Sequence, residues 1–124
     1  MSDEISKLPP NVQERLLRLQ QLQQTLQSIL AQKQQVDMEK TEVDQTIAEL
    51  EKTAEDAVIY KAIGSILVKA DKTKTKEELV ERKELLDTRT TVLAKQEERI
   101  RSQVKDAQTK LQQDLSPVSG QSLS

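Results

Sequence analysis

Few residues in this 124-residue chain could carry out chemistry, and their spacing does not form a reactive site. His and Cys are absent, which excludes imidazole acid–base chemistry and thiolate catalysis. Gly64 and Gly120 stand alone, so the sequence has no glycine-rich phosphate loop. The acidic neighbours Glu77–Glu78 and Glu97–Glu98 fall in helical patterns, where runs of charge are usually solvated faces. We therefore predict no enzyme activity, no cofactor and no metal site.

The composition indicates an elongated helical protein instead of a compact one. Hydrophobic residues make up 35% of the chain, below the usual level of about 45–50%, and Phe and Trp are absent. Lys and Arg number 19 against 21 Asp and Glu, which argues against nucleic acid or an anionic membrane surface as the main partner. The absence of Cys, of an apolar run of about 20 residues and of a signal-peptide core favours a soluble cytoplasmic protein.

A heptad pattern predicts a first long helix over about residues 12–53. Asn11 is the expected N-cap, after Pro9–Pro10, and Glu14 is its capping-box partner. Apolar residues then alternate at spacings of three and four, with Lys33 and Lys40 at two of the core positions. The apolar members of this seam are Leu19, Leu22, Leu26, Ile29, Val36, Val43, Ile47, Leu50 and Ala54.

A second helix is predicted over about residues 75–115. Thr75 and Glu78 form a T-x-x-E capping box at its start, and Pro117 and Gly120 end the pattern. Its apolar positions recur every seven residues, at Leu79, Leu86, Leu93, Ile100 and Ala107. The companion heptad position is polar at first and apolar later, at Lys83, Thr90, Glu97, Val104 and Leu111.

Two helices of equal length joined by a short insert are expected to pair as an antiparallel coiled coil. In that register, facing residues have numbers that add up to about 128, which brings Lys33 near Glu97 and Glu98. A core-position Lys that meets an acid on the other helix fixes register at some cost in stability. The alternative is that Lys33 and Lys40 only extend along the edge of the seam, and the sequence leaves both interpretations open.

The stretch between the helices, DAVIYKAIGSILVKAD (Asp56–Asp71), predicts a β-hairpin over about residues 58–70. Its arms are rich in β-branched residues, and Gly64–Ser65 suits a type II′ turn. The alternatives for this stretch are a continued helix or a bent apolar loop. The turn would place Ile59, Ile63, Ile66, Val68 and Ala70 on one face, and Val58, Tyr60, Ala62 and Leu67 on the other.

Neither face of this hairpin is polar enough for water, and a lone hairpin has two open edges. We therefore expect hairpins from several subunits to join in an intersubunit β-barrel that buries both faces. The residues assigned to this oligomerisation are Val58, Ile59, Tyr60, Ile63, Gly64, Ile66, Leu67 and Val68.

The chain resembles the β-type subunit of prefoldin, and most of all its archaeal form. The similarity covers nearly the whole chain and implies a single prefoldin-like domain over residues 1–124 with flexible termini. It rests on LPPNVQ (Leu8–Gln13), QQLQQ (Gln20–Gln24), AQKQQV (Ala31–Val36), DAVIYKAIGSILVK (Asp56–Lys69), EELVERKELLDTR (Glu77–Arg89) and LAKQEERI (Leu93–Ile100).

The resemblance implies an ATP-independent co-chaperone built of two α-type and four β-type subunits. In that family the hairpins form a double β-barrel, and the coiled-coil tips hold unfolded proteins and deliver them to a group II chaperonin. The corresponding apolar residues near the tips here are Leu8, Val12, Leu16, Leu17, Leu19, Leu111, Leu115 and Val118. Two alternatives stay open: these residues only close the end of the coiled coil, or the protein is a structural coiled-coil scaffold or tether without holdase activity.

Overall fold

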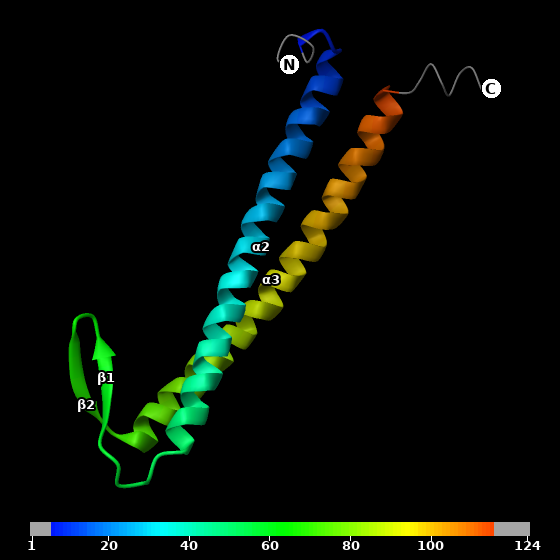
Figure 1. The fold of residues 1–124 in the computed structure, drawn as a ribbon. Coiled ribbons are helices and arrows are strands. Elements are labelled where there is room, and N and C mark those ends of the chain that lie inside the picture. Colours follow the sequence, from blue (N-terminus) through cyan, green and yellow to red (C-terminus); the bar gives the residue numbers. More distant parts are fainter. Residues whose placement is uncertain (1–5, 116–124) are drawn as a thin grey trace. The chain divides into compact units, whose positions relative to one another are not determined.

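The computed structural model describes residues 6–115 and is mainly α-helical, as the sequence predicts. Helix α2 (Pro10–Glu51) is followed by strands β1 (Ile59–Ile63) and β2 (Ile66–Ala70), and helix α3 (Lys72–Leu115) follows the strands (Figure 1). Two long helices joined by one hairpin confirm the predicted fold class. The expected flexible termini lie outside the described residues.

Helix α2 begins earlier than predicted, and Asn11 is not its N-cap. The carbonyl oxygen of Pro9 accepts hydrogen bonds from the backbone N–H groups of Val12 and Gln13, both at 3.0 Å. Pro10 therefore occupies the first helical position, where its missing N–H costs nothing and its fixed φ suits the helix. The side chain of Gln13 donates to the carbonyl oxygen of Leu8 at 2.7 Å and fixes the chain before the helix.

Helix α3 also begins earlier than predicted, because Asp71 caps it instead of Thr75. The Asp71 carboxylate accepts a hydrogen bond from the backbone N–H of Lys74 at 2.9 Å, three residues into the helix. The Asp71 carbonyl oxygen accepts from the N–H of Thr75 at 2.9 Å, which is an ordinary helical bond. An aspartate is an equally good N-cap, so the T-x-x-E pattern lies within the helix and does not start it.

The described residues are divided between two compact units. The first contains the α2 segment up to Gln32 and the α3 segment from Leu93, and the second contains Lys33–Val92. In the first unit the buried side chains are Val12, Leu22, Ile29, Leu93, Ile100 and Leu111. In the second they are Val36, Leu50 and Leu86. Except for Val12, all of these belong to the predicted heptad seams, so the same spacing provides the core of both units.

Two ion pairs show that the helices run antiparallel in the second unit, and one pair in the first unit agrees with the same register. In the second unit Lys40 pairs with Asp87, and Lys83 pairs with Asp44. In the first unit Arg15 of α2 pairs with Asp114 of α3. All three pairs follow the predicted register, in which facing residue numbers add up to about 128. The prediction that the whole chain acts as one domain stays a prediction.

The hairpin is formed as the sequence predicts, so a continued helix or a bent loop is wrong for residues 58–70. Strands β1 and β2 are antiparallel, with Ile59 opposite Ala70 and Ile63 opposite Ile66. Gly64 has a φ of 59° and Ser65 has no positive φ, which is the combination of a type II′ turn. A Cβ on Gly64 would meet nothing within 4 Å, so the glycine is needed for its backbone conformation and not for space.

Candidate functional site

The hairpin is the largest group of exposed apolar side chains that the described residues contain. Leu67 is 71% exposed and Tyr60 62%, and the other large apolar residues exposed here are Val58, Ile63, Ile66 and Val68. The sheet has two strands only, so the outer edge of each strand is unpaired in the single chain. An apolar hairpin with open edges is an aggregation hazard unless other chains cover it.

Three lysines form contacts near the hairpin: Lys61 joins β1 to α3, whereas Lys72 and Lys76 join the start of α3 to the chain at the end of α2. Lys61 of β1 pairs with Glu78 of α3, with 2.8 Å between Nζ and Oε2. This contact holds the pKa of the Glu78 carboxyl below its ordinary value, because Lys61 donates a hydrogen bond to it and adds a nearby positive charge. Lys72 Nζ donates to the carbonyl oxygen of Thr53 at 2.7 Å. Lys76 pairs with Glu51 at 3.0 Å, next to the end of α2.

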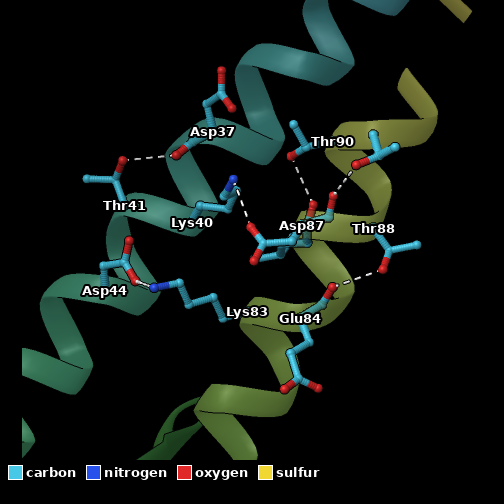
Figure 2. A network of polar contacts seen from close by, with 11 residues as sticks. Asp37, Lys40, Thr41, Asp44, Lys83, Glu84, Asp87, Thr88 and Thr90 are labelled. Carbon is cyan, nitrogen blue, oxygen red and sulfur yellow. Dashed lines mark hydrogen bonds and ion pairs between the residues drawn. The ribbon is translucent and has the colours of Figure 1, made fainter. Parts of the chain in front are cut away.

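A polar layer interrupts the apolar seam of the second unit. Figure 2 shows Lys40 of α2 directed at Asp87 of α3, and Lys83 of α3 directed at Asp44 of α2. The Nζ to Oδ1 distances are 2.9 and 2.8 Å. Each helix carries the pattern Lys-x-x-x-Asp, so antiparallel pairing lets each Lys meet the other helix's Asp. The hydrogen bond to Asp44 raises the pKa of Lys83 above its ordinary value.

Lys40 therefore faces an acid across the seam, which is the arrangement expected of a register-fixing residue. Its side chain is 27% exposed, so most of its stem lies between the helices. A one-turn slip of one helix would separate Lys40 from Asp87 and Lys83 from Asp44. The contribution predicted for Lys33 stays a prediction.

The residues predicted to bind unfolded proteins near the tips differ in how far they are exposed to solvent. Leu17 and Leu115 are exposed, at 56% and 57%. Val12 and Leu111 are buried, at 2% and 9%, so in this structure they close the helix pair instead of facing solvent. The remaining described members, Leu8, Leu16 and Leu19, are half-buried. Val118 lies outside the described residues.

A groove on the first unit was not predicted from the sequence. It holds about 350 Å³ between α2 and α3, and its rim carries charges of both signs. It is lined by Glu14, Arg15, Arg18, Leu22, Gln103, Asp106, Ala107 and Lys110. Because the groove exists only where two helices distant in sequence meet, periodicity along one helix could not reveal it. Arg15 on its rim pairs with Asp114.

The part of the chain that the structure describes contains no group of three or more metal-ligating side chains placed to hold an ion. Among its helices, none combines the length and the apolar character needed to cross a membrane.

Two heptad helices with an exposed apolar hairpin between them define a class of coiled-coil proteins that carry an exposed two-stranded sheet. Comparison with known proteins gives the family. The family model described as "Prefoldin subunit" matches residues 13–117. The chain therefore belongs to the prefoldin subunit family, whose members are components of chaperones and not enzymes.

Within this family the similarity is to β subunits. The prefoldin subunit beta of Methanothrix thermoacetophila is 46% identical over 88% of this chain and 91% of that protein. The prefoldin subunit beta of Archaeoglobus fulgidus is 41% identical over 94% of this chain and 100% of that protein. The crystal structure of the prefoldin beta subunit from Thermococcus strain KS-1 is similar with a TM-score of 0.75 and 38% identity, and the match covers 86% of this chain and 93% of that one.

Proposed function

We propose that the chain is a nucleotide-independent holdase subunit that binds unfolded proteins near its helix ends and assembles through its hairpin. The observation that carries this proposal is where large apolar side chains are left in solvent. They gather in the hairpin and occur at Leu17 and Leu115, close to the two ends of the described chain, and single ones lie along the helices between, at Met38, Val80, Leu85 and Val92. Exposed apolar residues on a helical surface bind apolar segments weakly and without sequence preference, as a holdase requires.

The similarity to prefoldin β subunits supports an assembly with α-type subunits. We propose two α-type and four β-type chains, with their hairpins joined in β-barrels. The unpaired strand edges support this arrangement, because closing a barrel removes them. Transfer of the bound protein to a group II chaperonin and a cytoplasmic location complete the proposal, and both follow from the family resemblance.

Burial narrows the residues proposed to contact unfolded proteins. Leu17 and Leu115 are accessible, and the half-buried Leu8, Leu16 and Leu19 add partial apolar surface around them. Val12 and Leu111 are buried, so we assign them to holding α2 and α3 together and not to contact with unfolded proteins. Substituting either buried residue would therefore lower stability before it altered binding.

The test is light scattering of a chemically unfolded protein diluted into the complex of this chain with an α-type prefoldin subunit, without ATP. We expect Leu17→Ser with Leu115→Ser to weaken suppression of aggregation several-fold, while the complex keeps its size. Met38→Ser is the matched control, because Met38 is 60% exposed on α2 but belongs to the second unit. If the Met38 variant loses as much suppression as the double variant, the proposed position of the site is wrong.

The same experiment separates the holdase from a structural scaffold or tether. A scaffold would form the complex and leave the scattering of the unfolded protein unchanged. Suppression that requires ATP would also contradict the proposal, because the chain has no glycine-rich phosphate loop.

A further inference from the structure

The groove on the first unit has a basic side chain on each of its two walls. Arg18 of α2 and Lys110 of α3 line the same cavity of about 350 Å³, and both are exposed. Their residue numbers add up to about 128, so they face each other in the register of the helix pair. The groove also has an apolar part, which the buried Leu22 and the half-buried Ala107 provide.

These two bases lack strong partners in the chain itself. Within residues 6–115, Arg18 forms no ion pair. Lys110 pairs with Asp106 of its own helix at 3.4 Å, but the two side chains are 56% and 70% exposed, and pairs of this kind contribute little. One turn nearer the helix ends, Arg15 meets the opposite charge of Asp114. Two facing bases repel each other instead, so an anion between them is favoured.

The acidic residues of the groove do not fill this position. Glu14 and Asp106 line the groove, each four residues before one of the bases on the same helix. In the heptad pattern Arg18 and Lys110 occupy g positions, which flank the seam, whereas Glu14 and Asp106 occupy the outer c positions. The bases therefore border the gap between the helices, and the acids lie at its outer rim.

The charge of the whole first unit also favours an anionic ligand. In the described part of this unit Lys and Arg outnumber Asp and Glu, whereas acids outnumber bases in Lys33–Val92. The formal charge of the full chain is −2, so positive charge is concentrated on the unit that contains Leu17 and Leu115. A local excess of positive charge attracts acidic segments of a polypeptide.

We propose that Arg18 and Lys110 bind the carboxylate of an Asp or Glu side chain in an unfolded polypeptide, so that the groove selects segments in which an acid neighbours apolar residues. Leu17 precedes Arg18 in α2 and offers exposed apolar surface to those neighbours. This inference rests on the proposed function, since its ligand is an unfolded protein. It adds a preference in charge to a site whose apolar contacts have no sequence preference.

Fluorescence anisotropy of two identically labelled peptides tests this preference. The peptides share the same apolar residues and differ only in whether Glu or Gln stands between them. In the complex with an α-type subunit, without nucleotide and at low salt, we expect the Glu peptide to bind about three- to tenfold more tightly, because its carboxylate meets two exposed cations. At 1 M salt, where the Debye length is about 3 Å, the two affinities should become nearly equal.

Two double variants locate the preference. Arg18→Gln with Lys110→Gln should bring the ratio of the two affinities to about one. Lys95→Gln with Arg99→Gln is the matched control, because both residues are exposed on α3 in the same unit and neither lines the groove. The control removes the same charge and should keep at least about half of the wild-type ratio. Circular dichroism shows whether each variant keeps its helices.

The inference is overturned if the wild-type complex binds both peptides equally at low salt, or binds neither. It is also overturned if the control variant loses the preference as fully as the groove variant, since the charge of the whole unit would then be responsible. Equal binding of both peptides leaves the proposed function intact, because a holdase needs no preference in charge. The proposed function fails only if the complex also leaves the scattering of an unfolded protein unchanged.

Discussion

The ion pair between Lys40 and Asp87 should contribute measurably to the pairing of α2 and α3 in the second unit. The Nζ to Oδ1 distance is 2.9 Å, and the side chains are 27% and 53% exposed. Exposed ion pairs typically contribute about 0.2–1 kcal/mol to stability. Because Lys40 occupies a seam position and is mostly covered, we expect a coupling energy near the top of this range, about 1 kcal/mol.

A double-mutant cycle measures this coupling. The variants are Lys40→Ala, Asp87→Ala and the combination of both, and the free energy of unfolding is obtained from urea titrations with equal slopes. The control pair is Lys52 with Glu49, a local pair at the end of α2 in which Lys52 is the first residue after the helix; the Nζ to Oε1 distance is 3.3 Å and the side chains are 72% and 75% exposed. Its coupling energy should be below about 0.4 kcal/mol, as for other pairs three residues apart on a helix surface.

Salt provides the second part of this test. At 1 M salt the Debye length falls to about 3 Å, so the coupling between Lys40 and Asp87 should fall to less than half. The reasoning is refuted if this pair couples no more strongly than Lys52 with Glu49. It is also refuted if the coupling is unchanged at high salt, since the contact would then not act through charge.

Three further predictions follow from single residues. Leu93 is 1% exposed, so Leu93→Ala should lower the free energy of unfolding by about 3 kcal/mol, measured by urea titration, and a loss below about 1 kcal/mol would contradict its place in the core. Gly64→Ala should cost about 1–2 kcal/mol through its φ of 59° and should weaken assembly of the complex in size exclusion, whereas Ser65→Ala should not. The pKa of Glu78 lies below its ordinary value, so the stability from its contact with Lys61 is present above the unfolded-state pKa and is lost as pH falls through the folded pKa. A ¹³C NMR titration should show a higher midpoint for Glu78 in Lys61→Ala, and an unchanged midpoint would contradict the contact.

The seam and the hairpin could be predicted from the sequence because each depends on a local period. Leu86, Leu93 and Ile100 recur every seven residues, and all three are buried. Gly64 at the first turn position predicts its own positive φ, since few other residues adopt that conformation. Side-chain spacing along one element was enough in these cases.

The helix starts were predicted less well, because several residues compete as caps. Asp71 and Thr75 are both good N-caps, and the sequence does not show which will be chosen. Asp71 is chosen where the hairpin ends at Ala70, so the strand leads directly into α3. At the start of α2, Pro10 takes the first helical position, so Asn11 lies inside the helix and does not cap it.

The exposure of the tip residues depends on tertiary contacts. Val12 and Leu17 belong to the same apolar stretch at the start of α2, yet one is buried and the other exposed. Which side of α2 faces α3 decides the difference, and the heptad spacing already indicates it, because Val12 precedes the seam residue Leu19 by seven positions and Leu17 lies outside the seam. The groove lined by Arg18 and Lys110 also depends on that pairing.

The most direct measurement is the aggregation of a chemically unfolded protein in the presence of the wild-type complex of this chain with an α-type prefoldin subunit, without nucleotide. We expect the complex to suppress the scattering and to stay intact throughout. An intact complex that leaves the scattering unchanged would contradict the holdase function and would favour a structural scaffold.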